Sequence, residues 1–126
     1  VNLGIIPGDG GAWYLPRIVG RAKAFEMAFT GDVLKARECL DIGLVHKIVS
    51  HDDLMEACMT MAKKIASKPP EALRMTKRLL KESEAQSLSS SLEMAAGFQA
   101  LAQSTRDHEE AAIAFVEKRK PVFTGR

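Results

Sequence analysis

The sequence predicts a mostly α-helical chain that contains one short strand and opens with a glycine-rich loop. Through most of the chain, apolar residues recur at steps of three and four, which places them on one face of a helix. Glycine and proline residues interrupt this pattern at intervals suited to a series of separate helices. Between residues 44 and 49 the pattern changes to alternation, with prominent β-branched side chains, and this predicts the strand.

The first twenty residues differ in character from the rest. A short apolar run, Val1 to Ile6, meets Pro7 and then the segment Gly8–Gly11, which stops regular structure and allows a tight backbone path. The apolar run is typical of a buried strand, yet no earlier segment could pair with it. Because the chain also begins at Val1 without Met, we expect it to be a piece of a longer protein.

We expect helices over residues 12–18, 21–29, 35–41, from the cap residues 50–53 to about 67, 71–83, 87–104 and from about 105 to 118. Gly31 and Gly43 stand just past two of these helices, where a left-handed cap is common. Ser87 and Thr105 stand where two of these helices are expected to begin. The tail from Lys120 to Arg126 is broken by proline and is expected to lie along the surface.

Composition limits the possible functions. At 126 residues and 46% hydrophobic content, the chain suits one packed domain, and a net charge of +2 does not indicate nucleic-acid binding. No apolar run is long enough for a membrane span, and we expect no targeting leader, because no charged-then-apolar segment occurs. Cys39 and Cys58 fall within apolar helical patterns and are interpreted as reduced core thiols. The expected location is therefore the cytoplasm, with the mitochondrial matrix left open. The histidines have no partners at metal-ligand spacing, so no metal site is expected.

Several segments, in the right order and spacing, resemble the enoyl-CoA hydratase/isomerase (crotonase) family: residues 2–11 (NLGIIPGDGG), 15–20 (LPRIVG), 29–32 (FTGD), 43–45 (GLV), 68–70 (KPP) and 115–121 (FVEKRKP). The resemblance covers essentially the whole chain but only the C-terminal part of such an enzyme. It implies that residues 1–20 end the α/β crotonase core with its active-site loop. Residues 21–126 would then form the C-terminal helical region that builds trimers.

The resemblance implies an enoyl-CoA hydratase that adds water across the double bond of 2-enoyl-CoA thioesters in fatty-acid breakdown. Family members hold the thioester oxygen in an oxyanion hole of two backbone N–H groups and use two glutamates as acid and base. By alignment, all of these groups lie outside this chain. We therefore expect the chain alone to be inactive. Coenzyme A is part of the substrate, and no separate cofactor is implied.

The resemblance assigns binding roles to four residues. Leu3 and Gly8 match positions that line the acyl pocket, and Phe115 and Lys118 match positions beside the nucleotide of coenzyme A. Each residue also has a structural alternative. Leu3 would pack in the core, Gly8 would serve turn geometry, Phe115 would be a core residue, and Lys118 would belong to a solvated helix end.

Asp9 is the remaining carboxylate in the glycine loop and has two interpretations. It would cap the following helix through the N–H groups of Gly11 or Ala12, or it would act as an acid or base on the acyl group. Certain isomerases of the family place an aspartate one position earlier, at Gly8. The alternatives to a hydratase are therefore an isomerase or another crotonase reaction that uses Asp9, or a non-catalytic helical assembly module. A homo-oligomer is expected, with a trimer or a dimer of trimers in the full-length protein.

Overall fold

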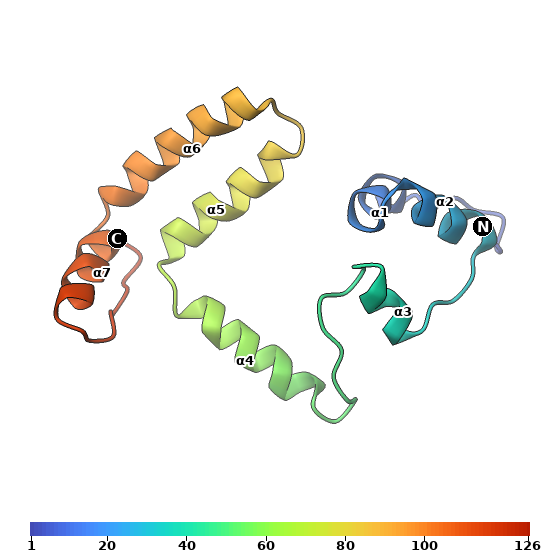
Figure 1. Cartoon of the computed structure of the whole chain (residues 1–126), viewed down its shortest axis with the longest axis horizontal. Helices are drawn as coiled ribbons and strands as arrows, with labels where there is room; N and C mark the ends of the chain where they lie inside the picture. The colour runs from blue at the N-terminus through green and yellow to red at the C-terminus, as the bar shows by residue number, and fades with distance from the viewer. The chain divides into compact units, whose positions relative to one another are not determined.

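The structure, a computed structural model, describes all of residues 1–126 and divides into two compact units, Val1–Leu54 and Met55–Arg126 (Figure 1). It contains seven helices and no strand. The chain is therefore organised as two units and not as one packed domain, and each unit is described by itself. The functional division at residue 20 that the resemblance implies stays a prediction.

The first unit contains α1 (Gly11–Val19), α2 (Arg21–Thr30) and α3 (Ala36–Asp41). α1 packs against α2, and Gly20, with a φ of 80°, makes the tight connection between them. Ala24 of α2 is buried. Residues 1–10 run beside this pair without regular structure, and Asn2 Nδ2 donates a hydrogen bond to the carbonyl oxygen of Gly31 at 3.3 Å. The helix pair thereby supports the opening segment.

The segment after α3 corrects one prediction. Gly43 caps the helix in the left-handed region with a φ of 76°, as predicted, and the next N–H, that of Leu44, donates to Cys39 at 2.8 Å. Residues 44–49, however, form no strand. Their alternating pattern favours an extended backbone, but a strand needs a neighbour that completes its hydrogen bonds, and this chain contains no other strand.

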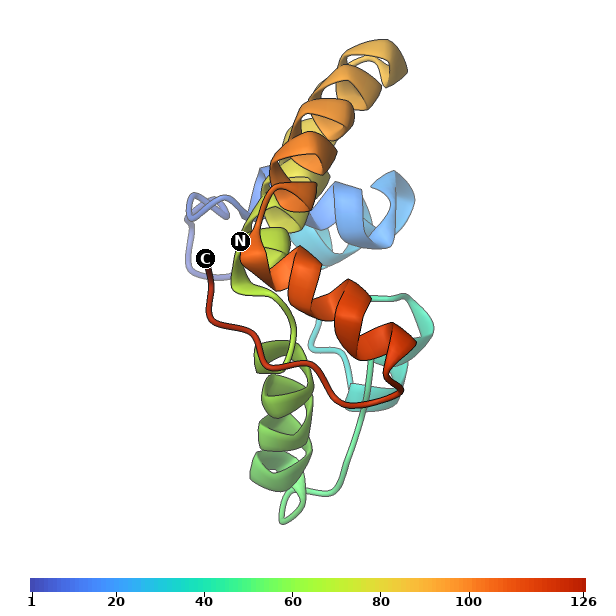
Figure 2. The same cartoon turned by 90° about the vertical axis from the view of Figure 1, so that its left-hand side faces the viewer.

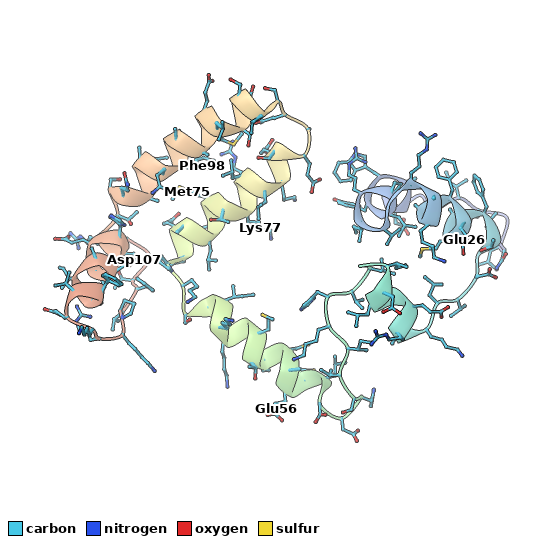
Figure 3. All side chains as sticks on the ribbon, viewed as in Figure 1. Glu26, Glu56, Met75, Lys77, Phe98 and Asp107 are labelled. Carbon is cyan, nitrogen blue, oxygen red and sulfur yellow. The ribbon has the colours of Figure 1, made fainter.

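The second unit contains α4 (Leu54–Ala66) apart from its first residue, followed by α5 (Pro70–Ser83), α6 (Leu88–Gln103) and α7 (Arg106–Val116). α5 and α6 lie side by side (Figures 1 and 2). Met75 and Phe98 point into the space between these two helices, whereas Lys77 points away from it (Figure 3). The Ser83 and Ser91 hydroxyls hydrogen-bond at 2.6 Å across the same pair. α5 and α6 therefore form a helical hairpin with a half-buried seam.

The helix starts follow the capping residues. Ser87 Oγ accepts a hydrogen bond from the Ser90 N–H at 3.2 Å, and Thr105 Oγ1 accepts one from the His108 N–H at 3.1 Å. The predicted starts of these two helices are therefore confirmed, and each start is an N-cap. α4 starts later than predicted. Ser50 Oγ accepts from the Asp53 N–H, but residues 51–53 form a turn, and the helix begins at Leu54.

Most predicted apolar stripes remain exposed in this chain. Ala24 and Ala114 are the only buried hydrophobic residues. On α4, Leu54, Met61 and Ile65 are 47%, 41% and 50% exposed, because α4 has no extensive packing contact with another helix. The two thiols are free, and the prediction that both lie in a core is wrong, because Cys39 is half-buried and Cys58 is exposed. The stripes thus lack the surfaces that would cover them.

Candidate functional site

The opening segment and α2 form a cleft of about 570 Å³ in the first unit. Leu3, Gly8 and Asp9 all line this cleft, opposite Met27 and Ala28 of α2. The structure therefore brings together the three candidate residues of the glycine loop. The other two candidates, Phe115 and Lys118, belong to the second unit and are considered separately.

Asp9 does not cap α1. The N-cap residue is Gly10, with a φ of 89°, and no side chain accepts a hydrogen bond from the first helical turn. Glycine suits this position because of its positive φ and because an added Cβ would lie 3.1 Å from Cε2 of Tyr14. The capping interpretation of Asp9 is therefore wrong. Its exposed carboxylate accepts no hydrogen bond from the chain and is the one acidic side chain that lines the cleft.

The structure also disfavours the structural interpretations of Leu3 as a core residue and of Gly8 as a glycine required by turn geometry. Leu3 is 86% exposed and packs in no core. Gly8 makes a tight turn, with its N–H donating to the Ile6 carbonyl at 2.8 Å, but its φ lies outside the region that favours glycine. An added Cβ would approach only that carbonyl oxygen, at 4.0 Å. Both residues therefore present free surface to the cleft.

A second cavity of about 520 Å³ lies against the same segment. Ile5 and Ile6 line both spaces, and the second is otherwise apolar, with Phe25 and Phe29 of α2 among its lining residues. Cavities of this size, with apolar walls and a few polar groups, are typical of small-molecule sites. The pair of spaces can accept a hydrocarbon chain and offers one carboxylate, that of Asp9, at the adjoining cleft.

At the end of α7, Phe115 is 84% exposed, so its interpretation as a core residue is wrong. Lys118 is exposed and has a φ of 56°, the only positive value among the non-glycine residues. The N–H of Lys118 donates to Phe115 at 3.3 Å, and the N–H of Arg119 donates to Ala114 at 3.0 Å. This pair of hydrogen bonds is a Schellman cap with lysine in the position that usually holds glycine.

Sequence reasoning missed how the C-terminal tail is held. Asp107 is 2% exposed, and its carboxylate accepts hydrogen bonds from the N–H groups of Thr124 at 2.7 Å and Gly125 at 2.9 Å. From the sequence alone, acidic residues in the first turn of a helix indicate only a favourable interaction with the helix dipole. The available signal was the spacing of Asp107 and Glu110, which places two acceptors one turn apart on α7, followed by a tail with free N–H groups.

Glu110 forms the second attachment of the tail. Its carboxylate makes two hydrogen bonds with the guanidinium of Arg119, at 2.5 and 2.8 Å, and accepts the Val122 N–H at 2.8 Å. The Arg119 guanidinium, and then the Val122 N–H, lower the pKa of Glu110 to about 2. The carboxylates of Glu110 and Glu117 raise the pKa of Arg119. Glu110 is therefore a charged anchor over the whole neutral range.

Comparison with known proteins identifies the class. All of residues 1–126 match the family described as enoyl-CoA hydratase/isomerase. The chain therefore belongs to the enoyl-CoA hydratase/isomerase (crotonase) family. No helix combines the length and apolar character that crossing a membrane requires, and no three His, Cys, Asp or Glu side chains are grouped as a metal site would need.

Three relatives define the similarity. The chain is 40% identical over 127 residues to a probable enoyl-CoA hydratase of Bacillus subtilis, covering 99% of this chain and 49% of that protein. It is 34% identical to the 1,2-epoxyphenylacetyl-CoA isomerase of Escherichia coli, and the match covers 99% of this chain and 48% of that protein. The crystal structure of an enoyl-CoA hydratase from Bacillus anthracis matches with a TM-score of 0.96 at 36% identity, covering 99% and 48%. The chain thus spans about half the length of these relatives and aligns with part of a crotonase-fold enzyme.

Proposed function

We propose that this chain is the C-terminal part of an enoyl-CoA hydratase, which adds water across the double bond of 2-enoyl-CoA thioesters in fatty-acid breakdown. The observation that carries the proposal is the cleft of about 570 Å³ at the glycine loop, together with the family membership. Several relatives are named as hydratases, among them crotonyl-CoA and short-chain-enoyl-CoA hydratases.

In this proposal, Leu3 and Gly8 line the space for the acyl group, and the apolar cavity beside them receives its hydrocarbon portion. Phe115 packs against the nucleotide portion of coenzyme A, and the ammonium of Lys118 pairs with a phosphate. The substrate is then an acyl-CoA, and coenzyme A enters as part of it. Residues 1–20 serve as the active-site loop, and residues 21–126 as the helical region.

The chain offers one carboxylate at the cleft, whereas addition of water across a conjugated double bond uses an acid and a base. The proposal therefore places the catalytic pair and the oxyanion donors in a segment that this chain does not contain. Crotonyl-CoA hydration tests it directly. A full-length protein containing this sequence should convert crotonyl-CoA to the 3-hydroxy product, and failure to do so across neutral pH would exclude the hydratase.

A second candidate is an isomerase, or another crotonase reaction, in which Asp9 transfers a proton at the acyl group. The uncapped, exposed carboxylate at the cleft favours it, and so do relatives named as isomerases. Asp9→Asn in the full-length protein separates the two. Loss of about 10²- to 10⁴-fold in kcat, with the acidic limb of the pH profile removed, supports Asp9 as a proton-transfer residue. Unchanged turnover and pH profile exclude that role.

We also propose that the full-length protein is a homo-oligomer, a trimer or a dimer of trimers, and that it acts in the cytoplasm. Exposed apolar faces such as that of α4 support association, because large exposed apolar surfaces are typical of interfaces. A non-catalytic assembly module remains the third candidate. It predicts association without any binding of coenzyme A, which calorimetry distinguishes from the enzyme.

A further inference from the structure

Two carboxylates on one side of α7 hold the C-terminal tail. Asp107 accepts the backbone N–H groups of Thr124 and Gly125, and Glu110 accepts that of Val122. The backbone N–H of Asp107 also donates to the Arg126 carbonyl at 3.2 Å. Figures 1 and 2 show the tail returning along α7. We name this arrangement of Asp107, Glu110 and Arg119 the tail clasp.

The tail clasp begins directly after Lys118, whose side chain stays exposed. The chain leaves α7 at Val116, turns at Lys118, and is fixed at the next residue by the two hydrogen bonds between Arg119 and Glu110. A lysine in the left-handed region is strained, and such strain persists only where the surroundings fix the backbone. The turn is fixed on one side by the helix and on the other by the ion pair.

We propose that the tail clasp positions Lys118 for recognition of a coenzyme A phosphate, with Asp107, Glu110 and Arg119 as positioning residues that do not contact the ligand themselves. This inference rests on the proposed binding role of Lys118. A flexible lysine would lose conformational freedom on binding, and a backbone already fixed before binding reduces that cost. The clasp therefore increases affinity for the nucleotide portion of the ligand without adding a contact.

Glu110→Gln in the full-length protein is the decisive substitution, because positioning and simple charge predict opposite results. Removal of a negative charge close to a phosphate site would tighten coenzyme A binding by charge alone. Loss of the clasp should instead raise the Kd about fivefold. Glu109→Gln removes the same charge from the neighbouring position, which makes no side-chain hydrogen bond to the tail, and should not raise the Kd.

Calorimetry with coenzyme A and with pantetheine, which lacks the nucleotide, completes the test. Lys118→Ala should also raise the Kd for coenzyme A, and Glu110→Gln should add no further loss in that background, because the two effects share one contact. Pantetheine binding should be unchanged in every variant. Two further measurements on the Glu110→Gln protein verify that only the clasp has opened. Amide-exchange protection at Val122 should be reduced, whereas the thermal stability of the protein should be unchanged.

The inference is overturned if Glu110→Gln leaves coenzyme A binding unchanged or tighter, if its effect is undiminished in Lys118→Ala, or if Lys118→Ala itself has no effect. Weaker pantetheine binding in Glu110→Gln would also overturn it, because the damage would then be general. Crotonyl-CoA turnover is measured on the same proteins. If the full-length protein does not hydrate crotonyl-CoA but its variants bind coenzyme A as predicted, the proposed reaction is overturned and the positioning role of the clasp is supported.

Discussion

Gly43 and Lys118 occupy the same position in two Schellman caps, at the ends of α3 and α7. Both have a positive φ, 76° for Gly43 and 56° for Lys118, but only glycine adopts that backbone without steric cost. A lysine there opposes stability.

Exchanging glycine and lysine at positions 43 and 118 should change the stability of the protein in opposite directions. Lys118→Gly should stabilise the protein by about 0.5–1 kcal/mol, because relief of the left-handed strain exceeds the added freedom of the unfolded chain. Gly43→Lys should destabilise it by about 1 kcal/mol from backbone strain, since an added Cβ meets no atom within 4 Å. Urea unfolding measures both. A destabilised Lys118→Gly protein would contradict the strain argument.

Gly31 allows a second test. Its φ is 65°, and an added Cβ would lie 2.6 Å from Nδ2 of Asn2, which donates to the Gly31 carbonyl. Gly31→Ala should therefore destabilise the protein by about 1–2 kcal/mol in urea unfolding. In an Asn2→Ala background the cost should be smaller, because the clash is gone and only backbone strain remains. Equal costs in the two backgrounds would show that the contact with Asn2 is unimportant.

Sequence reasoning at the residue level succeeded where a residue type matches its conformation. Gly31 and Gly43 were predicted as left-handed caps because glycine prefers that region. Lys118 could not be predicted, because lysine does not favour a positive φ. Asp9 was a plausible cap by its position, but Gly10 takes the N-cap, so the carboxylate stays free.

At the scale of elements, the tail clasp makes α7 sensitive to acid. Pairing lowers the pKa of Glu110 from 4.5 to about 2, so the charged carboxylate stabilises the folded tail. This contribution is fully present above pH of about 4.5 and is lost as the pH falls through about 2. Amide exchange at Val122, after correction for its intrinsic rate, should lose protection over that range. Glu110→Gln keeps an oxygen that can accept the Val122 N–H but loses the charged pair with Arg119, so its protection should be reduced and should not vary over that range. In the unsubstituted protein, unchanged protection at pH 2 would contradict the role of the ion pair.

The helices could be predicted from the sequence, but the strand and the clasp could not. Helical hydrogen bonds lie within one segment, so periodicity and caps such as Ser87 and Thr105 are sufficient. A strand depends on a partner, and residues 44–49 have none in this chain. The clasp joins Asp107 to Thr124 through the tertiary path of the tail, which local patterns do not specify.

At the scale of the whole molecule, composition predicted a packed core, yet few apolar side chains are buried. On α4, for example, the apolar stripe stays exposed because no other helix of the chain packs extensively against it. Of the candidate site residues, Leu3, Gly8 and Asp9 all line the cleft of the first unit. Their binding and catalytic roles remain proposals, because the chain covers about half of its relatives.

Exposed stripes predict association. This chain alone should form concentration-dependent assemblies, and Ile65→Glu on the α4 stripe should reduce their mean mass, because it places a charge in an apolar contact. Thr60→Glu adds the same charge outside the stripe and serves as the control. Light scattering measures the mass. Equal effects of the two substitutions would exclude the α4 stripe as an association surface.

Crotonyl-CoA hydration by this chain alone, at high protein concentration and beside the full-length protein, tests the central claim most directly. The account predicts hydration by the full-length protein and none above the uncatalysed rate by this chain, because its cleft offers a single carboxylate where the reaction needs an acid and a base. Turnover by the chain alone, with a rate proportional to its concentration, would contradict the account.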